Sequence, residues 1–320
     1  RMSKSNILDI IQDIKDGKMV IIIDDEAREN EGDLVCSADL VTPEIINFMA
    51  SKGKGLICLP MSTELCQKYD LQMMTNNNRA ANKTAFTVSI EAAEGITTGI
   101  SAADRSHTIK TAVSKSSNPS DIVQPGHVFP LKAMKGGVLS RAGHTEAACD
   151  LSKLAGLQSA GVICEIMNDD GTMARRDDLL KFGKENHIKV GTIADLIDYR
   201  LSMDATVESV LDKNVKNEFG EFKLNVWRDK IHDEYHFSLS KGDLKSVESP
   251  LVRVQTQSIL QDTLGIDELG KNWSIRDSLK KISEEGIGLF VLINYKDAKS
   301  YWLNKLEEKE IEPKSSRRVI

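Results

Sequence analysis

Residues 20–34 read V-I-I-I-D-D-E-A-R-E-N-E-G-D-L, an apolar run that passes at once into six carboxylates and one arginine. The apolar residues at 19–23 predict a buried strand, and residues 34–38 predict a second strand after the acidic turn. Composition alone fits a solvated, charged loop equally well. Two details favour a functional site: the acids follow the end of a buried strand, where ligand sites of α/β folds gather, and hard divalent cations prefer carboxylate oxygens.

Further elements alternate on both sides of this stretch. Apolar spacing predicts a helix over 7–14 that Gly17 ends, and Thr42 before Pro43 predicts the start of a helix over 43–52 that stops at Gly53. Other helices are expected at 63–69, 103–114, 144–154, 175–186 and 193–201, and other strands at 56–59, 86–90 and 161–167. This alternation predicts an α+β fold, a mixed β-sheet covered by helices.

The pattern changes near residues 201–206. Short strand-like runs follow at 220–226, 234–239, 251–255 and 289–294, around a helix expected at 275–285. We therefore expect two domains, residues 1–203 and a second, smaller α/β domain at 204–320, because domains usually contain roughly 100–200 residues.

The 320 residues are 40% hydrophobic and 28% charged, with a net charge of -6. This acidic balance argues against a nucleic-acid partner, and no apolar run approaches the roughly 18 residues that a membrane helix needs. Residues 1–6 have no signal-peptide core behind them, and the five cysteines form no C-x-x-C pair. We expect a cytoplasmic protein with reduced thiols and without a membrane segment.

A second polar stretch, R-A-G-H-T at 141–145, lies where a helix is expected to begin. It combines the cation of Arg141, the flexible Gly143, the imidazole of His144 and the hydroxyl of Thr145. Helix N-termini bind phosphate through free backbone N–H groups, and an arginine adds charge-assisted hydrogen bonds. Taken alone, the stretch fits an ordinary helix cap as well.

Two further candidates are single residues. His127 stands between turn-forming residues in G-H-V-F-P at 126–130, where a lone histidine is usually structural or exposed. Glu165 interrupts the apolar strand G-V-I-C-E-I-M, and a carboxylate on such a strand needs a partner. A buried glutamate is one source of a general acid or base.

Together these segments resemble 3,4-dihydroxy-2-butanone 4-phosphate synthase of riboflavin biosynthesis over residues 7–200. Five tracts carry the resemblance, in the order of the family: V-I-I-I-D-D-E-A-R-E-N-E-G-D-L, T-G-I-S-A-A-D-R, Q-P-G-H-V-F-P-L, R-A-G-H-T-E-A-A-C-D-L and V-I-C-E-I-M. The resemblance implies a lyase that forms the four-carbon phosphate and formate from ribulose 5-phosphate. It also implies a homodimer with active sites near the interface.

The resemblance further implies roles for individual residues. Glu29 and His144 would be the protein ligands of a pair of magnesium or manganese ions, and His127 and Glu165 would handle protons. The remaining residues would contact the substrate: Arg28 and Asp33 beside the metal, Arg141, Ala142, Gly143 and Thr145 around the phosphate, and Asp104, Arg105 and Thr108 in the same cleft. Glu29, His144 and Glu165 would touch the substrate as well.

The C-terminal third is similar to a degenerate GTP cyclohydrolase II domain. That family binds zinc through three cysteines, but Ser258, Leu269 and Lys271 stand at the matching positions, and residues 293–297 replace the Q-E-G-R-G tract. We therefore predict no zinc and no cyclohydrolase activity. The alternatives are a bifunctional enzyme that also opens GTP, a relic that stabilises the synthase, a regulatory or partner-binding module, and a non-catalytic protein that only binds sugar phosphate.

Overall fold

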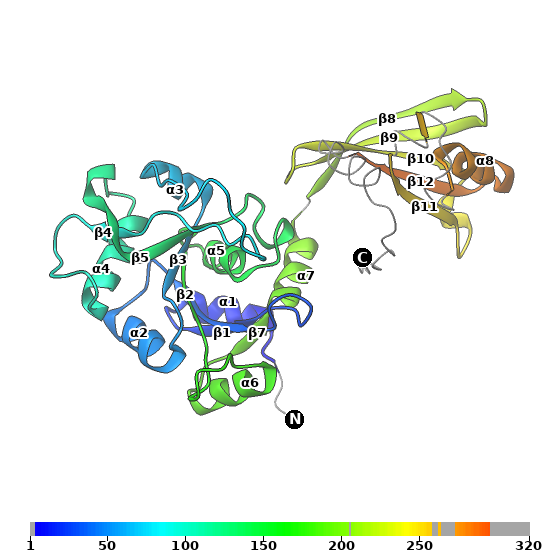
Figure 1. The fold of residues 1–320 in the computed structure, drawn as a ribbon. Coiled ribbons are helices and arrows are strands. Elements are labelled where there is room, and N and C mark those ends of the chain that lie inside the picture. The colour runs from blue at the N-terminus through cyan, green and yellow to red at the C-terminus, as the bar shows by residue number, and fades with distance from the viewer. Residues whose placement is uncertain (1–3, 205, 258–261, 264–272, 295–320) are drawn as a thin grey trace. The chain divides into compact units, whose positions relative to one another are not determined.

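The computed structural model describes residues 4–204, 206–257, 262–263 and 273–294. The chain divides into two compact units, Arg1–Asp204 and Ala205–Ile320 (Figure 1). Each unit has its own β-sheet. In the described part of the chain, no helix combines the length and the apolar character needed to cross a membrane.

The N-terminal unit is built on a seven-stranded sheet of order β4-β5-β3-β6-β2-β1-β7. Its strands are β1 (Val20–Ile23), β2 (Gly32–Ser37), β3 (Cys58–Met61), β4 (Ile90–Ala92), β5 (Ile122–Lys132), β6 (Gly161–Glu165) and β7 (Val190–Thr192). β3 pairs with β5, and β1 with β7, in parallel, whereas the other neighbours are antiparallel. The predicted mixed sheet is therefore confirmed.

Helices cover both faces of this sheet (Figure 1). They are α1 (Ile7–Lys15), α2 (Pro43–Phe48), α3 (Thr63–Lys68), α4 (Ala102–Val113), α5 (His144–Leu154), α6 (Arg176–Glu185) and α7 (Ile193–Met203). Val20 and Ile22 pack with α1, α5 and α7, whereas Ile21 and Ile23 pack in the core that includes α2, α3, α4 and α6. Successive strand residues point to opposite faces, so an uninterrupted apolar run fits a strand buried on both sides.

Two sequence-based expectations need correction, and one strand was not predicted. The predicted strand at 86–90 is reduced to single bridges at Phe86 and Thr87, and the regular strand begins only at Ile90. The helix predicted over 43–52 passes after Phe48 into a π-helical turn, Met49–Gly53, and Lys54 rather than a glycine takes the left-handed cap. β5 was not predicted, because Pro125 and Pro130 interrupt its pattern.

The C-terminal unit contains a five-stranded sheet of order β11-β12-β10-β9-β8. Its elements are β8 (Val207–Asn217), β9 (Gly220–Asp229), β10 (Glu234–Lys241), β11 (Leu251–Thr256), α8 (Ile275–Glu285) and β12 (Gly288–Ile293). α8 packs on the sheet through Leu279 and Ile282, which meet Phe222 and Phe290. β8 was not predicted, whereas α8 has the predicted bounds. Ser258, Leu269, Lys271 and Asp297, on which the comparison with cyclohydrolases depends, lie outside the described residues.

Candidate functional site

The acidic loop between β1 and β2 is organised by Asp24. This buried carboxylate accepts hydrogen bonds from the backbone N–H groups of Glu29 and Glu31, at 3.1 and 2.9 Å, and from the Arg28 guanidinium at 2.9 Å. Arg175 secures the loop from outside, because its Nη1 donates to the carbonyl of Glu29 at 2.9 Å. The loop is therefore a shaped turn that presents the side chain of Glu29, not a disordered charged segment.

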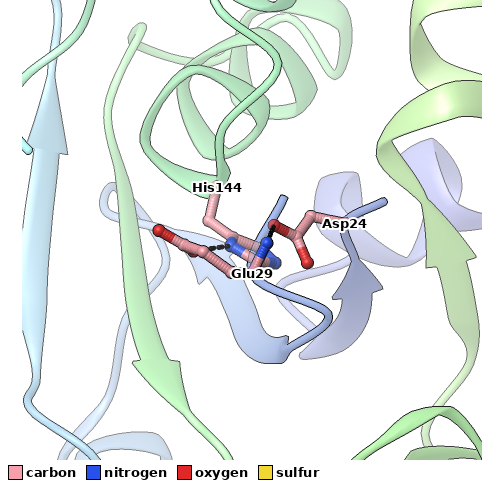
Figure 2. A group of neighbouring side chains, drawn as sticks. All are labelled: Asp24, Glu29 and His144. Atoms are coloured by element: carbon pink, nitrogen blue, oxygen red, sulfur yellow. Dashed lines mark hydrogen bonds and ion pairs between the residues drawn. The ribbon is translucent and has the colours of Figure 1, made fainter. Parts of the chain in front are cut away.

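His144 reaches this loop from the first turn of α5. Its Nε2 lies 3.0 Å from the carbonyl oxygen of Ile22, and its Nδ1 lies 3.8 Å from Glu29 Oε2 and from Asp33 Oδ1. Asp24, Glu29 and His144 each have one atom that could bind a metal ion, and these atoms all lie within 4.8 Å of one another (Figure 2). Because a carbonyl can only accept, Nε2 carries the proton in the neutral ring and Nδ1 is the nitrogen open to a cation.

The electrostatics of this cluster favour bound positive charge. Burial lowers the pKa of His144, but the surrounding carboxylates, Asp33 above all, outweigh it and raise that pKa to about 9. Burial raises the pKa of Asp33 to about 7, although His144 opposes the shift. Contact with His144 lowers the pKa of Glu29. Arg28, 3.0 Å from Glu29 Oε2, and a protonated His144 are the positive charges beside these acids.

Glu165 lies beside this cluster on the sheet. The register of β2 and β6 places it opposite Asp33, and its Oε2 accepts the backbone N–H of Leu56 at 2.8 Å. Gly55 makes this approach possible, because a Cβ there would lie 2.5 Å from Glu165 Oε2. A carboxylate on an apolar strand was expected to have a partner, and for Glu165 this partner is a backbone N–H group.

The R-A-G-H-T stretch forms the start of α5, with Gly143 as the N-cap and no side-chain cap. Arg141 donates to Glu146 at 2.7 Å and to the carbonyl of Asn82 at 2.9 Å, and a Cβ on Gly143 would lie 2.3 Å from Arg141 Nη1. Asn82 also donates to Glu29 Oε1 at 2.7 Å. Arg141 is thus held next to an uncapped helix N-terminus, and Asn82 links it to the acidic loop. Ala142 is exposed and Thr145 is buried.

His127 belongs to β5 rather than to a turn, which corrects the sequence-based expectation. A register shift in the β4–β5 pairing accommodates Gly126 and Pro125 within the strand. The side chain of His127 is 45% exposed, and its Nδ1 lies 2.6 Å from Glu91 Oε2. The role of Glu91 has no signal in the sequence, because 36 residues separate it from His127 and no local pattern marks the pair.

The strand order relates His127 to Glu165. β3 pairs with β5 at Cys58 and Phe129 and with β6 at Cys58 and Ile163, so these three residues form one row, and His127 and Glu165 each lie two residues beyond it in the same direction. Residues of one row point to the same face, and neighbouring strands lie roughly 5 Å apart. His127 and Glu165 therefore lie near the same end of two strands that β3 separates.

The residues predicted from α4 make other contacts. Asp104 accepts hydrogen bonds from Thr97 and from the Gly99 backbone, and Thr108 accepts the backbone N–H of Ala92 at 3.0 Å. Arg105 keeps a buried Nε that has no hydrogen-bond partner among the described residues. No recorded contact joins these three side chains to Glu29 or His144 in the described part of the chain, and their role in substrate binding stays a prediction.

Comparisons with known proteins agree with this arrangement. The family model described as 3,4-dihydroxy-2-butanone 4-phosphate synthase matches residues 8–199, and the one described as GTP cyclohydrolase II matches residues 208–317. A 3,4-dihydroxy-2-butanone 4-phosphate synthase of Pseudomonas aeruginosa is 49% identical over 294 residues, which are 92% of this chain and 80% of that protein.

Two solved structures are also similar. A two-domain 3,4-dihydroxy-2-butanone 4-phosphate synthase from A. baumannii, RibBX, is 44% identical, with a TM-score of 0.78 over 95% of this chain and 86% of that one. A synthase solved in complex with two magnesium ions is 40% identical, with a TM-score of 0.60 over 62% of this chain and 97% of that one. The resemblance inferred from the five sequence tracts is confirmed, and the chain belongs to the 3,4-dihydroxy-2-butanone 4-phosphate synthase family.

Proposed function

We propose that this protein converts D-ribulose 5-phosphate to L-3,4-dihydroxy-2-butanone 4-phosphate and formate in riboflavin biosynthesis, with the help of Mg²⁺ or Mn²⁺. The observation that carries the proposal is the convergence of Glu29, Asp33 and His144 beside the start of α5, next to Arg141. Formate release that requires a divalent cation and stops with a chelator tests it. If folded, metal-loaded protein released no formate, a role in binding a sugar phosphate without catalysis would be favoured instead.

The residues present fit a hard divalent cation. Carboxylate oxygens and an imidazole suit magnesium and manganese, and the Nδ1 of His144 and the carboxylate of Glu29 are the ligands that we assign. Asp24 has a different role in this proposal, since both of its oxygens already accept hydrogen bonds within the loop. When bound, the cation supplies positive charge to oxygens that become negative during the reaction. A related synthase holds two magnesium ions, which supports a pair here.

The sheet residues would move protons. Enediol formation, loss of a hydroxyl and skeletal rearrangement each require a proton to leave or reach a carbon or an oxygen. Glu165 lies opposite Asp33, and His127 lies near the same end of the sheet on β5, with β3 between β5 and β6. Groups of these types can accept a proton in one step and return it in the next.

The start of α5 would hold the substrate phosphate. The backbone N–H groups of the first turn have no side-chain cap, and Arg141 keeps its guanidinium beside them. In this proposal Gly143 and Thr145 also contact the phosphate, and Ala142 contacts it through its backbone. Arg28, paired with Asp24 and with Glu29 at 3.0 Å, would contact the sugar oxygens near the metal together with Asp33. A homodimer and a cytoplasmic location are further parts of this proposal.

Metal binding should depend on pH. The pKa of His144 is raised to about 9, so its ring is mostly protonated at pH 7, and a cation must displace that proton to reach Nδ1. We therefore expect magnesium affinity to rise with pH from 6 to 9 by up to about tenfold per pH unit for each proton released. Calorimetry in two buffers of different ionisation enthalpy measures the proton release. Affinity that stays constant over this range would contradict the assignment of Nδ1.

The C-terminal unit is proposed to lack cyclohydrolase activity. The last cysteine of the chain is Cys164, so the GTP cyclohydrolase II-like segment has no thiolate with which to bind zinc. We expect the 320-residue protein, incubated with zinc and GTP, to release no pyrophosphate and to retain no stoichiometric zinc after desalting. Zinc-dependent pyrophosphate release would instead support the bifunctional alternative.

A further inference from the structure

Glu91 is a buried carboxylate that the proposed reaction does not yet use. Its side chain is 10% exposed, and both of its oxygens face His127. Oε2 lies 2.6 Å from His127 Nδ1, and Oε1 accepts the His127 backbone N–H at 3.3 Å. Among the described residues, no hydrogen bond is recorded for Nε2 of the same ring. Glu91 therefore holds the Nδ1 edge of the imidazole, and the Nε2 edge stays available for contact with a substrate.

Two glycines allow the backbone to approach closely enough for this contact. At Gly126, a Cβ would lie 2.0 Å from the carbonyl oxygen of Ile90, and at Gly99, whose φ is +92°, a Cβ would lie 2.1 Å from Glu91 Oε2. The register of β4 and β5 shifts between Ile90 and Glu91. A bulge of this kind redirects a side chain, and here it places the carboxylate under the imidazole.

α4 lies alongside β4 (Figure 1), and its side chains hold the backbone at two positions next to Glu91. Thr108 Oγ1 accepts the backbone N–H of Ala92, the next residue along β4, at 3.0 Å. Asp104 Oδ2 accepts the N–H of Gly99, which borders the Glu91 carboxylate, at 3.0 Å. A surface ion pair formed by chance would have no such support. The conformation of Glu91 is fixed by buried contacts, as a residue that positions another side chain requires.

We propose that Glu91 is the positioning residue of His127 in the synthase reaction, an inference that rests on the proposed function. The carboxylate accepts the Nδ1–H of the ring, which leaves Nε2 unprotonated and pointed away from Glu91. Nε2 then takes a proton from the substrate and returns it in a later step. The negative charge of Glu91 stabilises the imidazolium in the interval, and no proton needs to pass to the carboxylate.

Glu91→Gln tests the proposal with almost no change in size. Two donors, the backbone N–H and Nδ1–H of His127, face the pair of oxygens, and an amide supplies one acceptor and one donor. We expect His127 to change tautomer so that Nε2 carries the proton. With this proton in place, kcat should fall by at least about 100-fold while KM stays within about twofold, because general acid–base catalysis contributes roughly 10²–10⁴-fold.

The matched control is Glu94→Gln, the same change at an exposed side chain three residues away. Nitrogen NMR of the imidazoles reports the tautomer of His127 independently of activity. In the wild type, the Nδ1–H form supports the proposal and the Nε2–H form overturns it. This readout stands even if the protein releases no formate, so failure of the proposed function and failure of the Glu91 assignment give different results.

A double-mutant cycle separates positioning from a general structural role. If Glu91 acts through His127, Glu91→Gln should cost little in kcat once His127 has been changed to alanine. An equal loss of kcat in both backgrounds, or a loss seen only as a fall in the melting temperature, would overturn the proposal. Glu91→Asp keeps the carboxylate at a shorter reach, and we expect it to retain more activity than Glu91→Gln.

Discussion

Glu29→Gln is expected to lower the turnover of ribulose 5-phosphate by more than about 100-fold, because loss of even an indirect metal contact typically costs 10–100-fold. The amide of glutamine carries no charge, so a cation bound to His144 Nδ1 would lose the anionic ligand that Glu29 supplies. His144→Ala should have an effect of the same order, since it removes that nitrogen. Formate release measures turnover, and calorimetric titration with magnesium measures the affinity.

The matched control for this prediction is Glu26→Gln, which changes an exposed acid of the same loop. It should leave both turnover and magnesium affinity near the wild-type values. Thermal unfolding should show that Glu29→Gln keeps the fold, because Asp24 rather than Glu29 organises the loop. Retained turnover of Glu29→Gln or His144→Ala at saturating magnesium would overturn the metal assignment.

Glu165→Gln is expected to lower kcat by roughly 10²–10⁴-fold, the range that general acid–base catalysis contributes, with substrate binding largely kept. The amide oxygen of glutamine can still accept the backbone N–H of Leu56, so the local fold should survive. Only the ability to take and return a proton is lost. Single-turnover formate release and binding of the substrate to the magnesium-loaded variant measure the two effects separately.

Glu185→Gln, on the exposed surface of α6, is the control for Glu165→Gln and should behave as the wild type. A Glu165→Gln variant that no longer binds the substrate would show that Glu165 positions the sugar. A variant with unchanged kcat would remove Glu165 from the proton-handling group.

Short-range patterns predicted most of the fold. The helix starts at Pro43 and His144 follow from residues next to each other in the chain, and Thr42 caps α2 as its side chain predicts. β5 was missed because prolines interrupt its pattern, and β4 was displaced because single bridges precede the regular strand. These features depend on which strand lies alongside, and local residue spacing does not contain that information.

The site residues also fall into those that a local sequence tract identifies and those whose role depends on tertiary contacts. The sequence tracts identified Glu29, His144, Arg141 and Glu165, and the structure brings the first two within one cluster. The roles of Asp24 and Glu91 could not be predicted, because they depend on hydrogen bonds that the folded loop and the β4–β5 bulge create. A carboxylate in a charged tract has the same local signal whether it binds a metal or shapes a turn.

The most direct test of the proposed reaction follows one carbon atom. Ribulose 5-phosphate labelled with ¹³C at carbon 4 is incubated with the protein and magnesium, with and without a chelator, and carbon NMR follows the label. We predict that the label leaves entirely as formate, only when magnesium is free, and that an unlabelled four-carbon phosphate accumulates with it. Label that stays in a sugar phosphate, or label released equally in the presence of chelator, would contradict the metal-dependent synthase reaction.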